Sequence, residues 1–169
     1  YKLEMVMQQA GVTTDYCPAV AASLKKAEES GLGAGAMVLP DGTVVTGKTS
    51  PLLGASPALL LNALKCLAGI DKKLELIPAS VIEPISRMKT TYLSHRNPRL
   101  HSDEVLLALA ISGLTNPLAA MVEKYLPALK GCDAHFSDII TQDDASTFLK
   151  LGVNFTTEPE FPTKSLYFR

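Results

Sequence analysis

The sequence predicts an α/β fold in which a small mixed sheet, containing a β-hairpin, is covered by several helices in a layered sandwich. The hairpin is predicted because short apolar runs at 36–39 and 43–46 flank Pro40-Asp41-Gly42, and an Asp-Gly pair readily takes the backbone conformation of a tight turn. The helices are predicted by apolar residues that recur at intervals of three and four. Further short apolar runs supply the other strands, which are expected at 74–77, 134–141 and, as an extension, 153–156.

The expected helices combine an apolar stripe with residues that favour a helix start or end. Gly31 favours a left-handed stop, and Asn116 followed by proline favours a start. At 80–93, Ser80 and Glu83 have the spacing of a capping box, and the apolar side chains of this helix, among them Met88 and Tyr92, are expected to face the core. The expected helical ranges are 1–10, 16–30, 57–68, 80–93, 105–111, 117–130 and 142–151.

The composition fits one ordinary globular domain covering residues 1–169 and excludes several classes of function. The chain has a mass of 18.1 kDa, and its 16 basic and 17 acidic residues leave a net charge of −1. This balance provides no field that would attract nucleic acid. No apolar run approaches the roughly 20 residues that span a bilayer. We therefore expect neither a nucleic-acid nor a membrane partner.

Cysteine and histidine usage predicts a reducing, cytoplasmic compartment and no metal site. The three cysteines are scattered without C-x-x-C spacing, and an odd number argues against a disulfide framework. The three histidines lack the close pairing with cysteine or glutamate that metal sites show. No sequence motif identifies a cofactor, so the cofactor remains unknown from the sequence.

Residues 42–49 fit the spacing of a phosphate loop, G-x-x-x-x-G-K-[ST]. Such a loop wraps backbone N–H groups around phosphates between a strand and a long helix. Here the intervening residues are Thr-Val-Val-Thr, whose β-branched side chains favour an extended strand, and Ser50-Pro51 follows where a helix would begin. A strand followed by a polar loop is the interpretation we favour, and a nucleotide loop is the alternative.

The polar loop after this strand is the first candidate binding site. It brings Gly47, Lys48, Thr49 and Ser50 to the end of a strand, close to a helix for which Ser56 is the expected N-cap. Open α/β sheets bind ligands where strands end, and a helix N-terminus offers free N–H donors to an anion. We expect these residues to hold a phosphate or carboxylate group. The alternative is that they only complete the hydrogen bonds of a turn and a cap.

The most polar segment, at 94–104, is the second candidate. It contains two histidines, two arginines and an acidic pair, which are the groups used for proton transfer and anion binding. Within it, Arg99 is the expected anion partner, and His101 and Asp103 are the candidate catalytic acid/base residues. Alternatively, Asp103 belongs to a first helical turn, where its charge suits the helix dipole.

Three long runs carry a resemblance to a known family. They are MVLPDGTVVTGKTSPLLGASPALLLNALKCLAGID, NPRLHSDEVLLALAISGLTNPLA and LGVNFTTEPEFPTKSLY. Together they resemble the C-terminal domain of a family of long, uncharacterised bacterial cytoplasmic proteins, some of which are labelled ATP-dependent peptidases. The resemblance implies a further, N-terminal domain as a partner, and it supplies no catalytic residues. The zinc motif H-E-x-x-H and the serine motif G-x-S-x-G are absent from the sequence.

Two functions remain open from the sequence. In the first, the domain contributes an anion-binding site to an enzyme that acts on a small molecule. In the second, it is a non-catalytic module for oligomerisation or regulation, which uses its first helix and the apolar residues 166–168 as contact surfaces.

Overall fold

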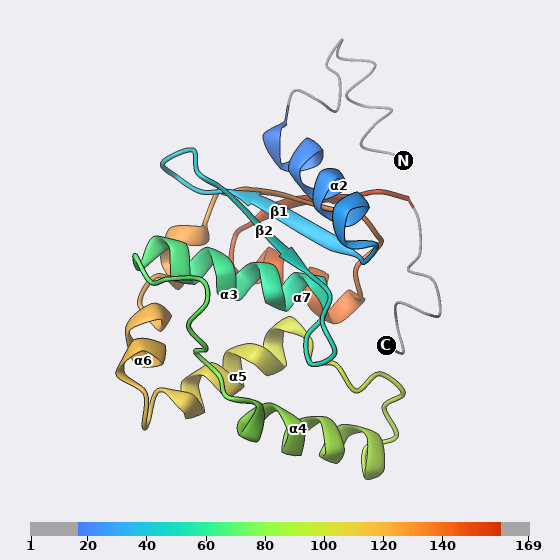
Figure 1. Ribbon diagram of the computed structural model, residues 1–169, viewed down its shortest axis with the longest axis vertical. Helices are drawn as coiled ribbons and strands as arrows, with labels where there is room; N and C mark the ends of the chain where they lie inside the picture. The colour runs from blue at the N-terminus through green and yellow to red at the C-terminus, as the bar shows by residue number, and fades with distance from the viewer. Residues whose placement is uncertain (1–16, 160–169) are drawn as a thin grey trace.

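The computed structural model describes residues 17–159, so the helix expected at 1–10 and the tail at 166–168 lie outside the described residues. Figure 1 shows the arrangement of the elements. In chain order they are α2 (Pro18–Ser30), β1 (Ala34–Val38), β2 (Val44–Lys48), α3 (Ala55–Leu67), α4 (Ala79–Thr91), α5 (Ser102–Ser112), α6 (Pro117–Glu123), the 3-10 helix Leu126–Leu129, β3 (Asp133–Phe136), α7 (Gln142–Lys150) and β4 (Asn154–Thr157).

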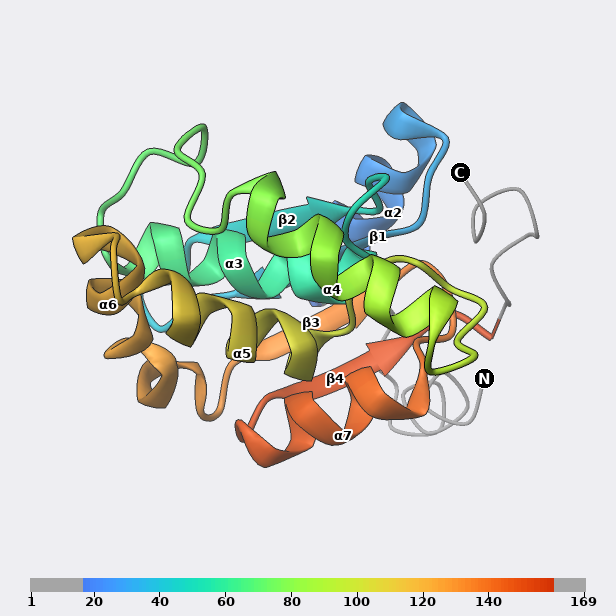
Figure 2. The same cartoon turned by 90° about the horizontal axis from the view of Figure 1, so that it is seen from below.

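The strands form one mixed sheet in the order β2-β1-β3-β4. β1 is antiparallel to both β2 and β3, whereas β3 and β4 are parallel and are joined by α7. Helix α2 covers one face of the sheet and α3 the other, with α4, α5 and α6 in a further layer beyond α3 (Figures 1 and 2). The predicted fold class, a layered α/β fold around a small mixed sheet, is confirmed.

The predicted hairpin is present and is closed by the expected turn. The Gly42 N–H donates to the Leu39 carbonyl at 2.8 Å, and Gly42 has a φ of 87°, which favours glycine. The Asp41 carboxylate accepts a hydrogen bond from the Thr43 N–H at 3.0 Å. The second strand extends further than predicted, so that Gly47 pairs with Gly35 inside the sheet. The backbone at 44–48 is therefore an extended ladder and does not wrap as a phosphate loop does.

Several sequence-based predictions of local structure are wrong. Residues 74–77 form no strand, although Leu76 and Ile77 are buried in the core. The apolar run indicated that these residues are buried, but it did not show that they pair with another strand. The strand predicted at 134–141 ends at Phe136, and the residues after it leave the sheet. The helix predicted at 117–130 stops at Glu123 and is followed by a short 3-10 helix that contains Pro127, a residue without an N–H donor.

Helix α4 also differs from its prediction, both at its start and in the face it buries. Pro78 is its N-cap, so Ser80 lies inside the helix and no capping box forms there. Met88 and Tyr92 are 52% and 71% exposed, and Lys89 is buried instead. Its ammonium group donates to the Arg99 carbonyl at 2.8 Å and pairs with the Glu104 carboxylate at 2.7 Å. A polar partner that is distant in sequence thus overrides the apolar pattern of the helix.

The core lies mainly between the sheet and α3. Met37 from β1 and the buried leucines of α3 belong to one continuous cluster of apolar side chains. At the β3–β4 edge, Phe136, Phe148 and Phe155 meet edge to face, an arrangement that aromatic rings favour. Within residues 17–159, no helix has the length and apolar character needed to cross a bilayer.

Candidate functional site

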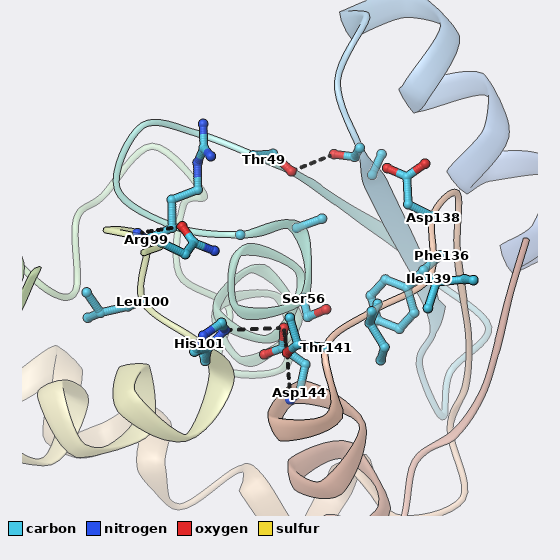
Figure 3. A pocket seen from close by; sticks show the side chains of 16 residues that line it. Thr49, Ser56, Arg99, Leu100, His101, Phe136, Asp138, Ile139, Thr141 and Asp144 are labelled. Carbon is cyan, nitrogen blue, oxygen red and sulfur yellow. Dashed lines mark hydrogen bonds and ion pairs between the residues drawn. The ribbon is translucent and has the colours of Figure 1, made fainter. Parts of the chain in front are cut away.

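A pocket lies where β2 and β3 end and three helices begin (Figure 3). Its wall is built from the start of β1, Thr49 after β2, the first turn of α3, the loop 97–101 and the segment 136–144 that leads into α7. Its volume is about 80 Å³. By the same measure one water needs roughly 10–15 Å³, so the pocket has room for a small polar molecule.

The N-termini of α3, α5 and α7 all contribute to the wall of this pocket. Each carries N–H groups without an intrahelical partner and the positive end of a helix dipole. Acidic residues occupy the first turns of α5 and α7. The first turn of α3 contains none, and its N-cap, Gly54, has no side chain. The start of α3 is therefore the part of the pocket best suited to an anion.

Ser56 places a hydroxyl group at the start of α3. The prediction that it caps this helix is wrong, because Gly54 is the N-cap and Ser56 lies in the first turn. The residue is only 2% exposed and contributes to the pocket wall. Its hydroxyl makes no hydrogen bond to residues 17–159, and unlike the Ser112 hydroxyl it is not fully enclosed by protein. Figure 3 shows it between the Asp144 and Asp138 sides of the pocket.

His101 and Asp144 form an ion pair in the pocket wall. The His101 Nδ1 lies 3.9 Å from the Asp144 Oδ2, and the side chains are 14% and 8% exposed. Contact with the carboxylate raises the pKa of the His101 imidazole, against the opposing effect of burial. His101 is also the N-cap of α5, where its side chain and that of Glu104 form a capping box. The raised pKa favours a positive charge on His101 near neutral pH.

Asp144 is held by hydrogen bonds from two helix starts. Its Oδ1 accepts from the Ser102 N–H at 2.8 Å and from the Ser102 hydroxyl at 2.7 Å, and its Oδ2 accepts from the Thr141 hydroxyl at 3.0 Å. Burial alone would raise the pKa of this carboxyl. The contact with His101 and the bonds from Ser102 outweigh burial and hold the pKa below its usual range. Asp144 is thus a fixed negative charge that orients His101.

Arg99 is fixed in the same loop. The residue is 3% exposed, and its Nε donates to the Ser50 carbonyl at 2.6 Å. Burial lowers the pKa of its guanidinium, which nevertheless stays protonated at neutral pH. The loop is held from behind by Glu104, which accepts from the His101 N–H at 2.8 Å and from Lys89. The buried Lys89–Glu104 pair therefore sets the position of both Arg99 and His101.

The structure brings together some of the predicted site residues and not others. Thr49, Ser56, Arg99 and His101 line the pocket, and the Ser50 carbonyl binds the Arg99 side chain just behind it. Asp103 is exposed on the first turn of α5. Gly47 and Lys48 belong to β2 and line a separate groove beside Lys26 and Lys72. The predicted set thus divides between two surfaces.

Sequence reasoning missed Asp138 and Asp144. Both lie in or after the segment assigned to a long strand, so neither was considered for a pocket. A usable signal was present at Asp144, because Thr141-x-x-Asp144 has the spacing of a helix start. No such signal marks Asp138. Across residues 17–159, no group of three or more His, Cys, Asp or Glu side chains is arranged to hold a metal ion.

The fold and the pocket define an α/β domain with a small polar cavity at the carboxyl ends of two strands. The chain belongs to the family described as domain of unknown function DUF1846, C-terminal, whose model matches residues 15–167. It is 46% identical over 166 residues to a UPF0371 protein of Corynebacterium efficiens and 45% identical to one of Streptococcus thermophilus. A third, from Streptococcus pyogenes, is 44% identical.

These matches confirm the resemblance that the sequence indicated. Each covers 98% of this chain and only 34% of the relative. The chain thus spans about a third of the length of these curated relatives, and it corresponds to their C-terminal domain.

Proposed function

We propose that this C-terminal domain supplies the anion-binding part of an active site in a bacterial cytoplasmic enzyme that acts on a small phosphorylated or carboxylated molecule. The observation that carries the proposal is the hydroxyl of Ser56, a residue only 2% exposed, which contributes to the pocket at the start of α3 and has no hydrogen-bond partner among residues 17–159. An anion seated there would accept hydrogen bonds from this hydroxyl and from the backbone N–H groups of the first turn. His101 and Arg99 add positive charge to the same pocket.

The His101–Asp144 pair supports an acid/base role beside this anion. Asp144 holds the Nδ1 side of the ring, so that a proton can be gained or lost at Nε2. In this proposal His101 is the catalytic residue, Asp144 is its positioning residue, and Thr49 and Arg99 complete the ligand-facing wall. Asp103, Gly47 and Lys48 have no place in this pocket.

Ser56→Ala is expected to weaken binding of inorganic phosphate by the full-length protein about tenfold, the usual loss when a hydrogen bond to a charged group is removed. Isothermal titration calorimetry measures this affinity. Ser112→Ala is the matched control, because it removes the hydroxyl of another buried serine that has no partner in the described part of the chain and lies outside the pocket. Equal affinity in the Ser56 variant and the wild type, or no binding of phosphate or acetate by the wild type, would contradict the proposal.

A role in assembly is the second candidate, and it has a separate observation. Leu107, Ile111 and Leu114 are 68%, 56% and 84% exposed on and just after α5. Their spacing of four and three residues places them along one side of that helix, where they offer an apolar strip to a second copy of the protein.

The apolar strip predicts that the protein self-associates through α5 and that charged substitutions in the strip weaken this association. Leu107→Glu combined with Leu114→Glu is expected to raise the dimer dissociation constant at least about tenfold, measured by sedimentation velocity on the full-length protein. Leu149→Glu is the control, because Leu149 is a similarly exposed leucine, at 64%, on a different helix, α7. A wild type that sediments as a monomer at all concentrations would exclude this candidate.

A further inference from the structure

We propose that the pocket selects small molecules that carry an ammonium group a few bonds away from their anionic group. This inference rests on the proposed function, because the anion is taken to sit at Ser56. It adds a second recognition element, the carboxylate of Asp138. In Figure 3, Asp138 lies across the pocket from Arg99 and His101, and Ser56 lies between Asp138 and His101.

The charges of the wall lead to this assignment. Its charged and titratable side chains are Arg99, His101, Asp138 and Asp144. Asp144 is committed to the protein, since both of its oxygens accept hydrogen bonds from the starts of α5 and α7 and one faces His101. Asp138 also interacts within the protein, but it is only half-buried at the pocket wall, whereas Asp144 is 6% exposed, so Asp138 is the carboxylate that a ligand can reach. A carboxylate has about four lone-pair sites, so it can accept an ammonium group in addition to any protein contact.

Gly33 is what lets Asp138 lie against the wall. A Cβ atom added at Gly33 would be 2.5 Å from the Asp138 Oδ2, closer than such atoms approach in proteins. The glycine is fixed there because its carbonyl accepts from the Thr49 N–H at 2.9 Å and from the Thr49 hydroxyl at 3.2 Å. The backbone at position 33 therefore makes room for a carboxylate at the edge of the pocket.

An anion at Ser56 and a cation at Asp138 define a zwitterionic ligand. A purely anionic ligand would gain nothing from Asp138 and would be repelled by it. The volume of about 80 Å³ limits the ligand to a short molecule. Aminoalkyl phosphates and short amino acids share the required chemistry, and they differ only in whether the anion is a phosphate or a carboxylate.

Matched ligand pairs test the inference on the full-length protein by calorimetry. Phosphoethanolamine is compared with ethyl phosphate, and β-alanine with propionate, so that the two pairs also separate a phosphate from a carboxylate anion. In at least one pair the ligand with the amine is expected to bind about tenfold more tightly. Ser56→Ala is expected to weaken binding of both members of that pair, which locates the binding in this pocket.

Two substitutions isolate the contribution of Asp138. Asp138→Asn is expected to remove the preference for the amine while leaving the affinity for the ligand without an amine no weaker. Gly33→Ala is expected to do the same, because its Cβ displaces the flexible carboxylate and leaves that carboxylate chemically intact. Asp133→Asn, on the exposed start of β3 and outside the pocket, is the control and should change nothing.

The outcomes separate this inference from the proposed function. If both members of each pair bind equally at the Ser56 site, the selection of an amine is excluded and the anion site stands. If Asp138→Asn and Gly33→Ala both retain the preference for the amine, the assignment to Asp138 is overturned. If no ligand of either pair binds, the proposed function fails together with this inference.

Discussion

Gly47→Ala is expected to lower the free energy of unfolding by about 2 to 3 kcal/mol, the upper part of the usual range for overpacking a core. A Cβ atom at this position would lie 2.4 Å from the Leu59 N and 2.6 Å from the Leu59 Cα. These are backbone atoms of α3, and Leu59 itself is fully buried. They cannot move aside as the end of a flexible side chain can, so β2 and α3 would have to separate. Urea-induced unfolding measures the change.

Lys48→Ala is the control for this prediction. Lys48 follows Gly47 in β2 and is exposed, so its removal should change the unfolding free energy by less than about 0.5 kcal/mol. It should also leave phosphate affinity unchanged, because Lys48 lies outside the pocket. A phosphate loop predicts the reverse pattern, with ligand affinity lost in both variants. Unaltered stability in the Gly47 variant would contradict the packing of β2 on α3.

Gly47 also shows why the fold was easier to predict than the site. The turn at 39–42 and the helix α3 depend on neighbouring residues, whose chemistry can be read along the chain. The role of Gly47 depends on which helix crosses the strand at that point, and no local pattern contains this information. The same residue therefore fitted a phosphate-loop spacing equally well.

The sequence-based predictions were wrong or incomplete for buried polar residues whose partners are distant in the sequence. Lys89 is buried because its ammonium group binds the Glu104 carboxylate and the Arg99 carbonyl. The sequence pattern instead predicted that the apolar Met88 would be buried, because Lys89 is charged. Asp144 meets His101 and Ser102 across 42 to 43 positions of sequence. Arg99 and His101 were identified because they are neighbours in one polar segment, whereas Asp144, the partner of His101, is distant in sequence and was not identified.

Asp144→Ala is expected to lower the free energy of unfolding by about 3 kcal/mol, because removing one partner leaves buried polar groups unpaired. Asp144 is 6% exposed and accepts hydrogen bonds from the Ser102 N–H, the Ser102 hydroxyl and the Thr141 hydroxyl. All three donors would lose their acceptor in the variant. Unfolding in urea again gives the measurement. A loss below about 1 kcal/mol would show that water replaces the carboxylate easily and that the site is open.

The same pair predicts how stability depends on pH. The folded state raises the pKa of His101 above 6.5, so its contribution is complete below that value and is lost as pH rises through the folded pKa. The folded state lowers the pKa of Asp144 below 3.8, so its contribution is present above that value and is lost as pH falls through the folded pKa. The pair should therefore stabilise the protein most between about pH 4 and 6.5.

Asp144→Asn separates the charge from the geometry, because an amide oxygen can still accept from Ser102. The pKa of His101, followed by NMR of the imidazole protons, is expected to fall in this variant, since burial then acts without the opposing carboxylate. His135 is an internal control, because burial already lowers its pKa to about 4 and its ring contacts Thr156 instead. If the pKa of His101 were the same in Asp144→Asn as in the wild type, the Asp144 carboxylate would not stabilise the charged imidazole. Asp144 would then not be the positioning residue in the acid/base role proposed for His101.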